Sequence, residues 1–147
     1  MARILSIDYG RKRTGLAVTD PLQIIASGLA TVSTSELFDY LRNYTAQEQV
    51  ELIVIGEPRQ PNGTPSENLA RVQQFVARWR KAVPDIPIEY YDERFTSVLA
   101  HRAMIDGGLR KKDRQNKALV DEISATIILQ DYMRSRTRPL SQGSTGV

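Results

Sequence analysis

The chain has 147 residues, of which 41% are hydrophobic and 25% charged, and its formal net charge at pH 7 is +3. This length and balance predict one globular domain that buries a core without crosslinks. The absence of cysteine excludes disulfides and thiolate zinc sites, and the single histidine leaves metal chemistry to carboxylates, which select hard ions such as Mg²⁺ or Mn²⁺.

The first part of the chain predicts three strands joined as an antiparallel meander. Residues 3–8 alternate toward the interior, and residues 14–19 and 24–32 are rich in β-branched side chains, with a turn at Pro21 between them. The apolar stretch at the start is too short for a signal peptide or a membrane span. We therefore expect a cytoplasmic protein that has no membrane partner.

A change to helical spacing follows. Ser33 and Glu36 match a capping box, and apolar residues then recur at helical intervals to about residue 48. Residues 52–56 form a continuous apolar run, which is typical of a strand buried on both faces. The segment from Thr64 to Glu67 matches a helix start, with proline at the first helical position.

The second helix is predicted to end at Pro84, and residues 86–91 predict a fifth strand. A third helix is expected to begin after Thr96, and a last helix to run from about residue 114 to 133. The polar tail, residues 135–147, is expected to be flexible and to follow a domain of residues 1–134. The order of elements predicts an α/β fold with a mixed five-stranded sheet, in which three meander strands precede two parallel strands.

Acidic residues follow three of the predicted strands. Asp8 ends the first, Glu57 follows the fourth, and Asp92 and Glu93 follow the fifth. Ligands of open α/β sheets bind at the carboxyl ends of the strands, so these acids are candidates for one shared site. Asp121 lies among the apolar residues of the last helix, where it either pairs with a cation such as Lys117 or ligates a metal ion.

Basic residues accompany these acids. Arg11, Lys12 and Arg13 directly follow the first strand, and a further cluster includes Lys111 and Lys112. Carboxylates from separate elements can hold two divalent ions that activate water against a phosphodiester, and nearby cations would bind such a polyanion. Each cluster taken alone also fits an ordinary solvated surface.

Four motifs occur in order: IDYGRKRTGLAVTD (7–20), VIGEPRQPNGTPSE (54–67), YDERFTS (91–97) and KALVDEISATIIL (117–129). With them the sequence resembles the YqgF/RuvX family of Holliday-junction-resolvase-like proteins, from residue 3 to about 134. The resemblance implies an RNase H-like three-layer α/β/α fold. It also implies a Mg²⁺- or Mn²⁺-dependent nuclease with a two-metal site that processes the end of pre-16S rRNA during ribosome biogenesis.

Carried over by position, the resemblance implies that Asp8, Glu93 and Asp121 are the metal-binding catalytic acids. It also implies that four residues contact the substrate or orient these acids: Arg13, Arg94, Thr96 and Lys117. Many relatives carry an apolar residue at the position of Glu57, which is therefore either an additional metal ligand or a loop acid.

Other functions remain open at this point. The substrate is pre-rRNA or branched DNA, and the protein is a monomer or a homodimer. A non-catalytic factor that binds rRNA during ribosome assembly would carry the same basic surface. A kinase of the actin–hexokinase type also has an Asp-x-Gly hairpin, but it needs two domains to close around a nucleotide, and 147 residues supply one.

Overall fold

The computed structural model describes residues 2–58, 68–93 and 117–146. Their centre is a five-stranded sheet whose strands lie in the order β3-β2-β1-β4-β5. The strands are β1 (Arg3–Asp8), β2 (Arg13–Thr19), β3 (Ala26–Ser33), β4 (Val50–Glu57) and β5 (Ile88–Asp92). β1 pairs antiparallel with β2, which pairs antiparallel with β3, while β1, β4 and β5 run parallel. This topology confirms the predicted meander followed by two parallel strands.

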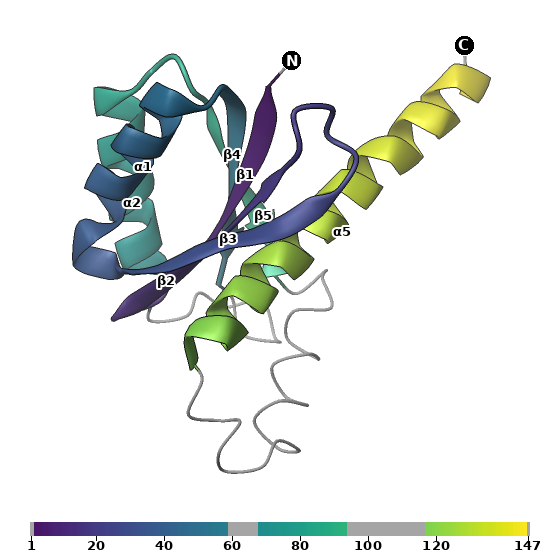
Figure 1. The fold of residues 1–147 in the computed structure, drawn as a ribbon. Coiled ribbons are helices and arrows are strands. Elements are labelled where there is room, and N and C mark those ends of the chain that lie inside the picture. The colour runs from purple at the N-terminus through teal and green to yellow at the C-terminus, as the bar shows by residue number, and fades with distance from the viewer. Residues whose placement is uncertain (1, 59–67, 94–116, 147) are drawn as a thin grey trace, which may run out of the picture.

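Helices cover both faces of the sheet (Figure 1). A 3₁₀ turn, η1 (Thr34–Glu36), leads into α1 (Leu37–Gln47), which lies with α2 (Leu69–Ala82) on one face. α5 (Lys117–Gly146) crosses the other face diagonally and extends beyond it. The three layers are those of the predicted RNase H-like architecture.

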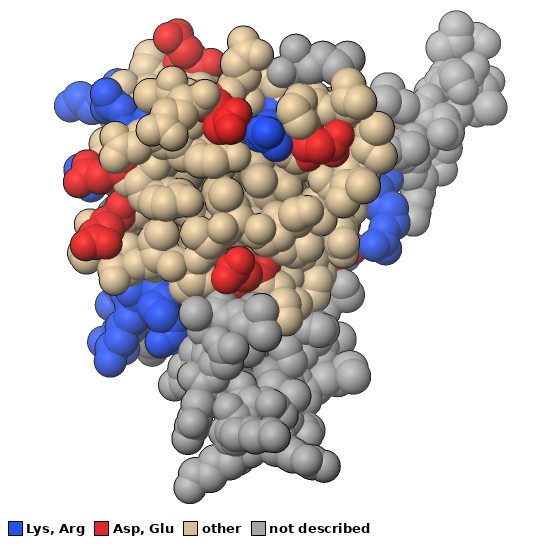
Figure 2. All heavy atoms as spheres, in the orientation of Figure 1, with Lys and Arg blue, Asp and Glu red and all other residues tan. Residues whose placement is uncertain are grey.

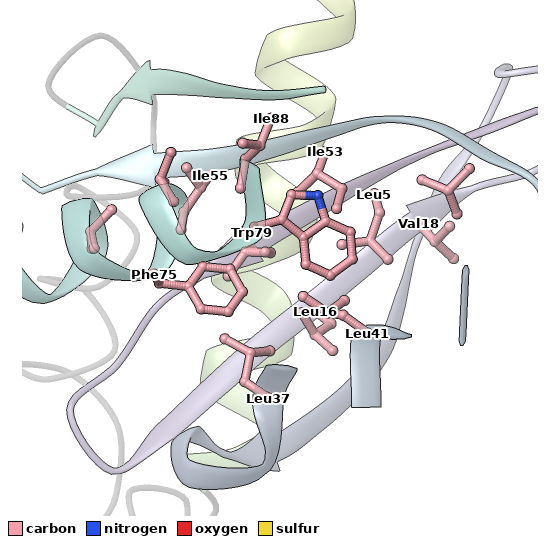
Figure 3. Packing of buried hydrophobic residues seen from close by; sticks show 14 residues of the cluster. Leu5, Leu16, Val18, Leu37, Leu41, Ile53, Ile55, Phe75, Trp79 and Ile88 are labelled. Carbon is pink, nitrogen blue, oxygen red and sulfur yellow. The ribbon is translucent and has the colours of Figure 1, made fainter. Parts of the chain in front are cut away.

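The face covered by α1 and α2 holds the larger core. β1, β2, β4 and β5 contribute alternate apolar residues to it, because successive side chains of a strand point to opposite faces. Trp79 of α2 is fully buried among them (Figure 3), and its indole N–H donates to the carbonyl of Ile86 at 3.1 Å. Here the helices are held to the sheet by large side chains.

The face covered by α5 holds a smaller core, in which the fully buried Ile128 and Leu129 of α5 pack together with small residues. Its buried residues include Ala17 of β2, Val54 of β4 and Ala125 of α5. The hydroxyl of Ser6, in the middle of β1, donates to the carbonyl of Ala125 at 2.6 Å. A buried side chain of β1 is thus bonded to the backbone of α5, which fixes the helix along the strand.

The predicted capping box is wrong. The side chain of Ser33 makes no capping hydrogen bond, and the backbone enters α1 through the 3₁₀ turn. The neighbouring Thr34 hydroxyl instead donates to the carbonyl of Gly10 at 2.7 Å, and its backbone N–H donates to the carbonyl of Lys12 at 2.9 Å. The backbone conformation at the start of α1 is therefore set by contacts of Thr34 with the β1–β2 turn, and not by a side-chain cap from Ser33.

The predicted end of the last helix, near Met133, is also wrong, because α5 continues to Gly146. Arginine has good helix propensity, but the proline at position 139 disfavours a helix interior, so the local sequence does not explain why the helix continues. The flexibility expected of this tail remains a prediction. The helix start predicted at Thr64–Glu67 and the helix predicted after Thr96 lie outside the described residues.

Candidate functional site

Asp8, Glu93 and Asp121 lie at the same end of the sheet, on the face covered by α5. Asp8 follows Ile4 and Ser6 on this side of β1, and it is only 5% exposed. Because β1 and β4 run parallel, and Ile7 pairs with Ile55, Asp8 is level with Gly56 on the neighbouring strand. On its other side, Asp8 pairs with Gly15 of β2.

Glu93 approaches from the β4 side. Its carboxylate lies over Gly56, so close that a Cβ atom there would stand 2.7 Å from the Glu93 Oε1 atom. Glu93 is only 4% exposed. Its carboxylate fills the space above Gly56 that the side chain of any larger residue at position 56 would need. Glu93 can therefore occupy this position only because residue 56 is a glycine.

Asp121 approaches from the β2 side. A Cβ atom at Gly15 would stand 3.0 Å from the Asp121 Cβ atom and still closer to the Asp121 carbonyl oxygen. The backbone of α5 consequently rests directly on β2 at this position. Since Gly15 is also the antiparallel partner of Asp8, the same contact brings Asp121 to the level of Asp8.

The Asp121 carboxylate is held by a cation from the β1–β2 turn. Arg13 Nε donates to Asp121 Oδ2 at 3.2 Å, and both side chains are partly exposed. The sequence pattern suggested Lys117 as the partner, but the side chain of Lys117 lies outside the described part of the structure. Only the fold could reveal the Arg13 pair, because its members are 108 positions apart in the chain.

Glu57 lies on the opposite face. It follows Ile53 and Ile55, both in the core under α1 and α2, and strand alternation sends its side chain to that same side. Its negative charge contributes to raising the pKa of Tyr90, after the larger effect of burial, which fits a position near the tyrosine on this face. The ligand role of Glu57 stays a prediction, although the sheet separates it from the three other acids.

The turn between β1 and β2 is tightly built. Gly10 N–H donates to Thr14 Oγ1 at 3.4 Å, and the hydroxyls of Thr14 and Thr34 are 2.9 Å apart. A side chain at Gly10 would collide with the carbonyl of Arg13. The sequence did not predict a role for Thr14 or Thr34 in this turn. The alternating pattern of β2 indicates only that Thr14 is buried.

The other predicted nucleic-acid-binding residues divide into two groups. Arg11, Lys12 and Arg13 are exposed at the β1–β2 turn. Figure 2 shows Lys and Arg side chains gathered at the lower left, where Figure 1 has the start of β2 and the beginnings of α1 and α2. Four predicted residues lie outside the described part of the chain: Arg94, Thr96, Lys111 and Lys112.

The donor set fits a hard divalent ion, because it consists of carboxylate oxygens and two of the three acids are buried. In the described parts of the chain, no three acidic or histidine side chains already stand close enough to hold an ion together. In this arrangement the guanidinium of Arg13 lies beside Asp121, so an ion would compete with that guanidinium for the carboxylate.

Among the described residues, no helix combines the length and the apolar character that crossing a bilayer requires.

The chain is similar to known proteins over most of its length. The family model described as RuvX, Holliday junction resolvase, matches residues 2–135. Two relatives, each named "Putative pre-16S rRNA nuclease", come from Phocaeicola vulgatus and Bacteroides thetaiotaomicron. They are 64% and 61% identical over 136 residues, which is 92% of this chain and 98% and 99% of theirs.

A solved structure titled "T. thermophilus RuvC in complex with Holliday junction substrate" superposes with a TM-score of 0.56. The match covers 93% of this chain and 96% of that one, and 16% of the aligned residues are identical. At this identity the likeness concerns the fold, and it agrees with the RNase H-like architecture predicted above.

Proposed function

The chain belongs to the family described as RuvX, Holliday junction resolvase, and from that premise we propose that it is a divalent-metal-dependent nuclease that cuts the precursor of 16S rRNA. The observation that supports this proposal is that Asp8, Glu93 and Asp121 lie on the same face and at the same end of the sheet, at the level of Gly15 and Gly56. The names of the relatives support the choice of substrate. Work on this RNA implies a cytoplasmic location.

Each acid would contribute carboxylate oxygens to Mg²⁺ or Mn²⁺ from a different element of the fold. Divalent ions bound there would activate water and offset the charge that builds on the leaving oxygen of a phosphodiester. Asp8 is central because its strand lies between the strands that carry Gly15 and Gly56. Its position suits a carboxylate shared between two ions.

Arg13 keeps Asp121 oriented until an ion binds. The Arg13 side chain is 43% exposed at the edge of the site, so its guanidinium would be available to a substrate phosphate if Asp121 held an ion instead. Arg11 and Lys12, on the same turn, would hold the neighbouring backbone of the nucleic acid. Arg94, Thr96, Lys111, Lys112 and Lys117 remain proposed substrate contacts on the strength of the family resemblance.

The proposal is tested with Glu93→Gln, which keeps the size of the side chain and removes its charge. Cleavage of an RNA that spans the 16S precursor end should fall by more than about 100-fold, because direct ligands matter more than the outer partners, whose loss costs 10–100-fold. Binding of Mn²⁺ alone, followed by electron paramagnetic resonance, should weaken as well. Asp8→Asn should have the same two effects.

The matched control is Glu57→Gln, which removes the same charge from the other face of the sheet. It should cleave like the unchanged protein; a loss as large as that of Glu93→Gln would make Glu57 a ligand. If the unchanged protein binds the RNA but never cuts it with Mg²⁺ or Mn²⁺, the protein is an assembly factor and the proposal fails.

The description of the family favours one further candidate, a resolvase of branched DNA. A four-way DNA junction of matched length distinguishes the two, because the same three acids would cut either substrate. Faster cleavage of the junction than of the RNA would assign the protein to DNA. Sedimentation of the complex would at the same time show whether one or two copies bind.

A further inference from the structure

A hollow opens at the same end of the sheet as the acids but on the opposite face, between the β1–β2 turn, α1 and α2. Its volume is about 510 Å³. Three arginines and three aromatic residues dominate its lining: Arg11, Arg71, Arg78, Tyr9, Phe38 and Phe75. Among the described residues that line it, none is acidic. The hollow therefore presents positive charge and aromatic surface together.

The aromatic part is arranged as a continuous wall. The ring centroids of Tyr9 and Phe75 are 5.7 Å apart, and those of Phe38 and Phe75 are 6.4 Å apart in an edge-to-face arrangement. The guanidinium carbon of Arg78 lies only 3.9 Å from the centroid of Phe38. A guanidinium stacked in this way offers its outer plane to a further flat group, as nucleobases do.

Packing of the core does not account for the whole arrangement. Phe75 is buried, and Tyr9 and Phe38 are partly buried against the same cluster, so these three rings also stabilise the fold. The arginines are exposed, however, and come from two separate elements, the β1–β2 turn and α2. Arg71 and Arg78 are seven residues apart and so share one face of the helix. Stability alone gives no reason for three cations to gather at one aromatic hollow.

Tyr9 connects this hollow to the acids. It directly follows Asp8 in the chain, and strand alternation places the two side chains on opposite faces of the sheet. Arg11 belongs to the turn between Asp8 and Arg13, so a strand of nucleic acid that crosses the turn meets both regions.

We propose that this hollow binds an unpaired nucleotide of the RNA next to the bond that is cut, with the base against Arg78 and Phe38 and the phosphates at Arg11 and Arg71. The inference rests on the proposed function, since it names a subsite of the same substrate. Unpaired bases can enter such a hollow and stack on aromatic or arginine planes, whereas bases inside a duplex cannot. The subsite therefore selects single-stranded RNA beside the scissile bond.

The test measures affinity without cleavage. A fluorescent single-stranded oligoribonucleotide is titrated into the Glu93→Gln protein, which retains the whole hollow, and its anisotropy is followed at several salt concentrations. Adding Arg78→Gln should weaken binding by about 10-fold, the effect of losing one stacked base. Adding Arg71→Gln should lower the slope of log affinity against log salt by about 0.7, as expected for one phosphate contact on a single strand.

The matched control is Lys81→Gln, an exposed residue of α2 that does not line the hollow. It removes the same charge from the same helix and should leave the affinity unchanged. Arg78→Lys separates charge from stacking, because it keeps the cation but loses the guanidinium plane; it should bind as weakly as Arg78→Gln. Thermal unfolding of each variant shows whether the fold is preserved.

The two proposals fail separately. Equal weakening by Arg78→Gln and Lys81→Gln would overturn the subsite and leave the nuclease assignment intact. Weakening by Arg78→Gln of binding to a four-way DNA junction but not to single-stranded RNA would also overturn it. If the selective loss of RNA affinity appears in a protein that cuts no RNA, the subsite stands and the nuclease function falls.

Discussion

The two faces of the sheet differ in the size of their cores and in how closely a helix approaches the strands. The face under α1 and α2 is filled by large residues such as Leu16, Phe75 and Trp79. On the face under α5, glycines at positions 15, 28 and 56 leave room for the helix and for the side chains of Glu93 and Glu122. Large apolar side chains are buried on both faces, but on the face under α5 bare backbone at Gly15 and Gly56 also allows the close approach of Asp121 and Glu93.

The largest expected effect tests the first half of this comparison. Trp79→Ala should lower the free energy of unfolding by about 3–5 kcal/mol, because it empties a fully buried site of the larger core. Cleavage per folded molecule should be unchanged at low temperature, since Trp79 is on the opposite face from the acids. Urea unfolding and a cleavage assay measure the two quantities. A loss of cleavage in protein that is still folded would show that the faces are not separable.

Gly15→Ala tests the second half. The added methyl group would collide with the backbone of α5 at Asp121, which cannot move independently of the helix. We expect a loss of about 1–3 kcal/mol in the free energy of unfolding, as for other overpacked sites, together with a loss of cleavage as Asp121 is displaced.

Gly28→Ala is the matched control for this change. Gly28 faces the same helix, but the nearest atom to its added methyl would be Glu122 Oε1 at 3.1 Å, at the end of a flexible side chain. This variant should lose less stability and keep its activity. Equal losses of activity in both variants would mean that the helix position in general, rather than the place of Asp121, controls the site.

The smallest effect is expected at the far end of the sheet, away from both sites. Asp20 accepts backbone hydrogen bonds from Ile24 at 2.7 Å, Ile25 at 2.8 Å and Leu22 at 3.2 Å. The bond from Ile25 is the largest cause of a pKa below the usual 3.8. The unfolded chain therefore binds the proton more readily, so this contribution to stability is complete above about pH 3.8 and is lost as the pH falls through the lower folded value.

Asp20→Asn should flatten the acid side of the stability profile without changing cleavage at neutral pH. Thermal unfolding of both proteins between about pH 2.5 and 6 measures this difference. An unchanged slope would show that the Asp20 loop contributes nothing to acid sensitivity, and a change in neutral-pH cleavage would connect this loop to the site at the other end.

Much of the fold could be predicted because its signals are local. Alternation identified β1 and β2, and a continuous apolar run identified β4 between its two parallel neighbours. The errors occurred where distant contacts decide local structure. The local pattern at Ser33 is typical of a helix cap, but the conformation there depends on the hydrogen bond from the Thr34 hydroxyl to the carbonyl of Gly10, 24 positions away.

The candidate acids illustrate the same division. The sequence predicted that Asp8 ends a strand and that Glu93 follows one, because strand ends follow from the apolar pattern before them. The sequence did not predict that Glu57 lies on the opposite face of the sheet from these acids, because the assignment of a face depends on which helices cover it. The hollow at Tyr9 and Arg78 was also missed, because its walls come from segments about 70 positions apart that only the packing of α2 brings together.

The sequence by itself thus determined the kinds of elements, the carboxylate chemistry and the family, all of which follow from composition, periodicity and motif order. Tertiary structure alone decided that Arg13 pairs with Asp121, that Gly15 and Gly56 admit the acids, and that the arginines meet aromatic rings on the other face. The physical reason is that register and helix docking set distances between segments far apart in the chain, and no local pattern specifies those distances.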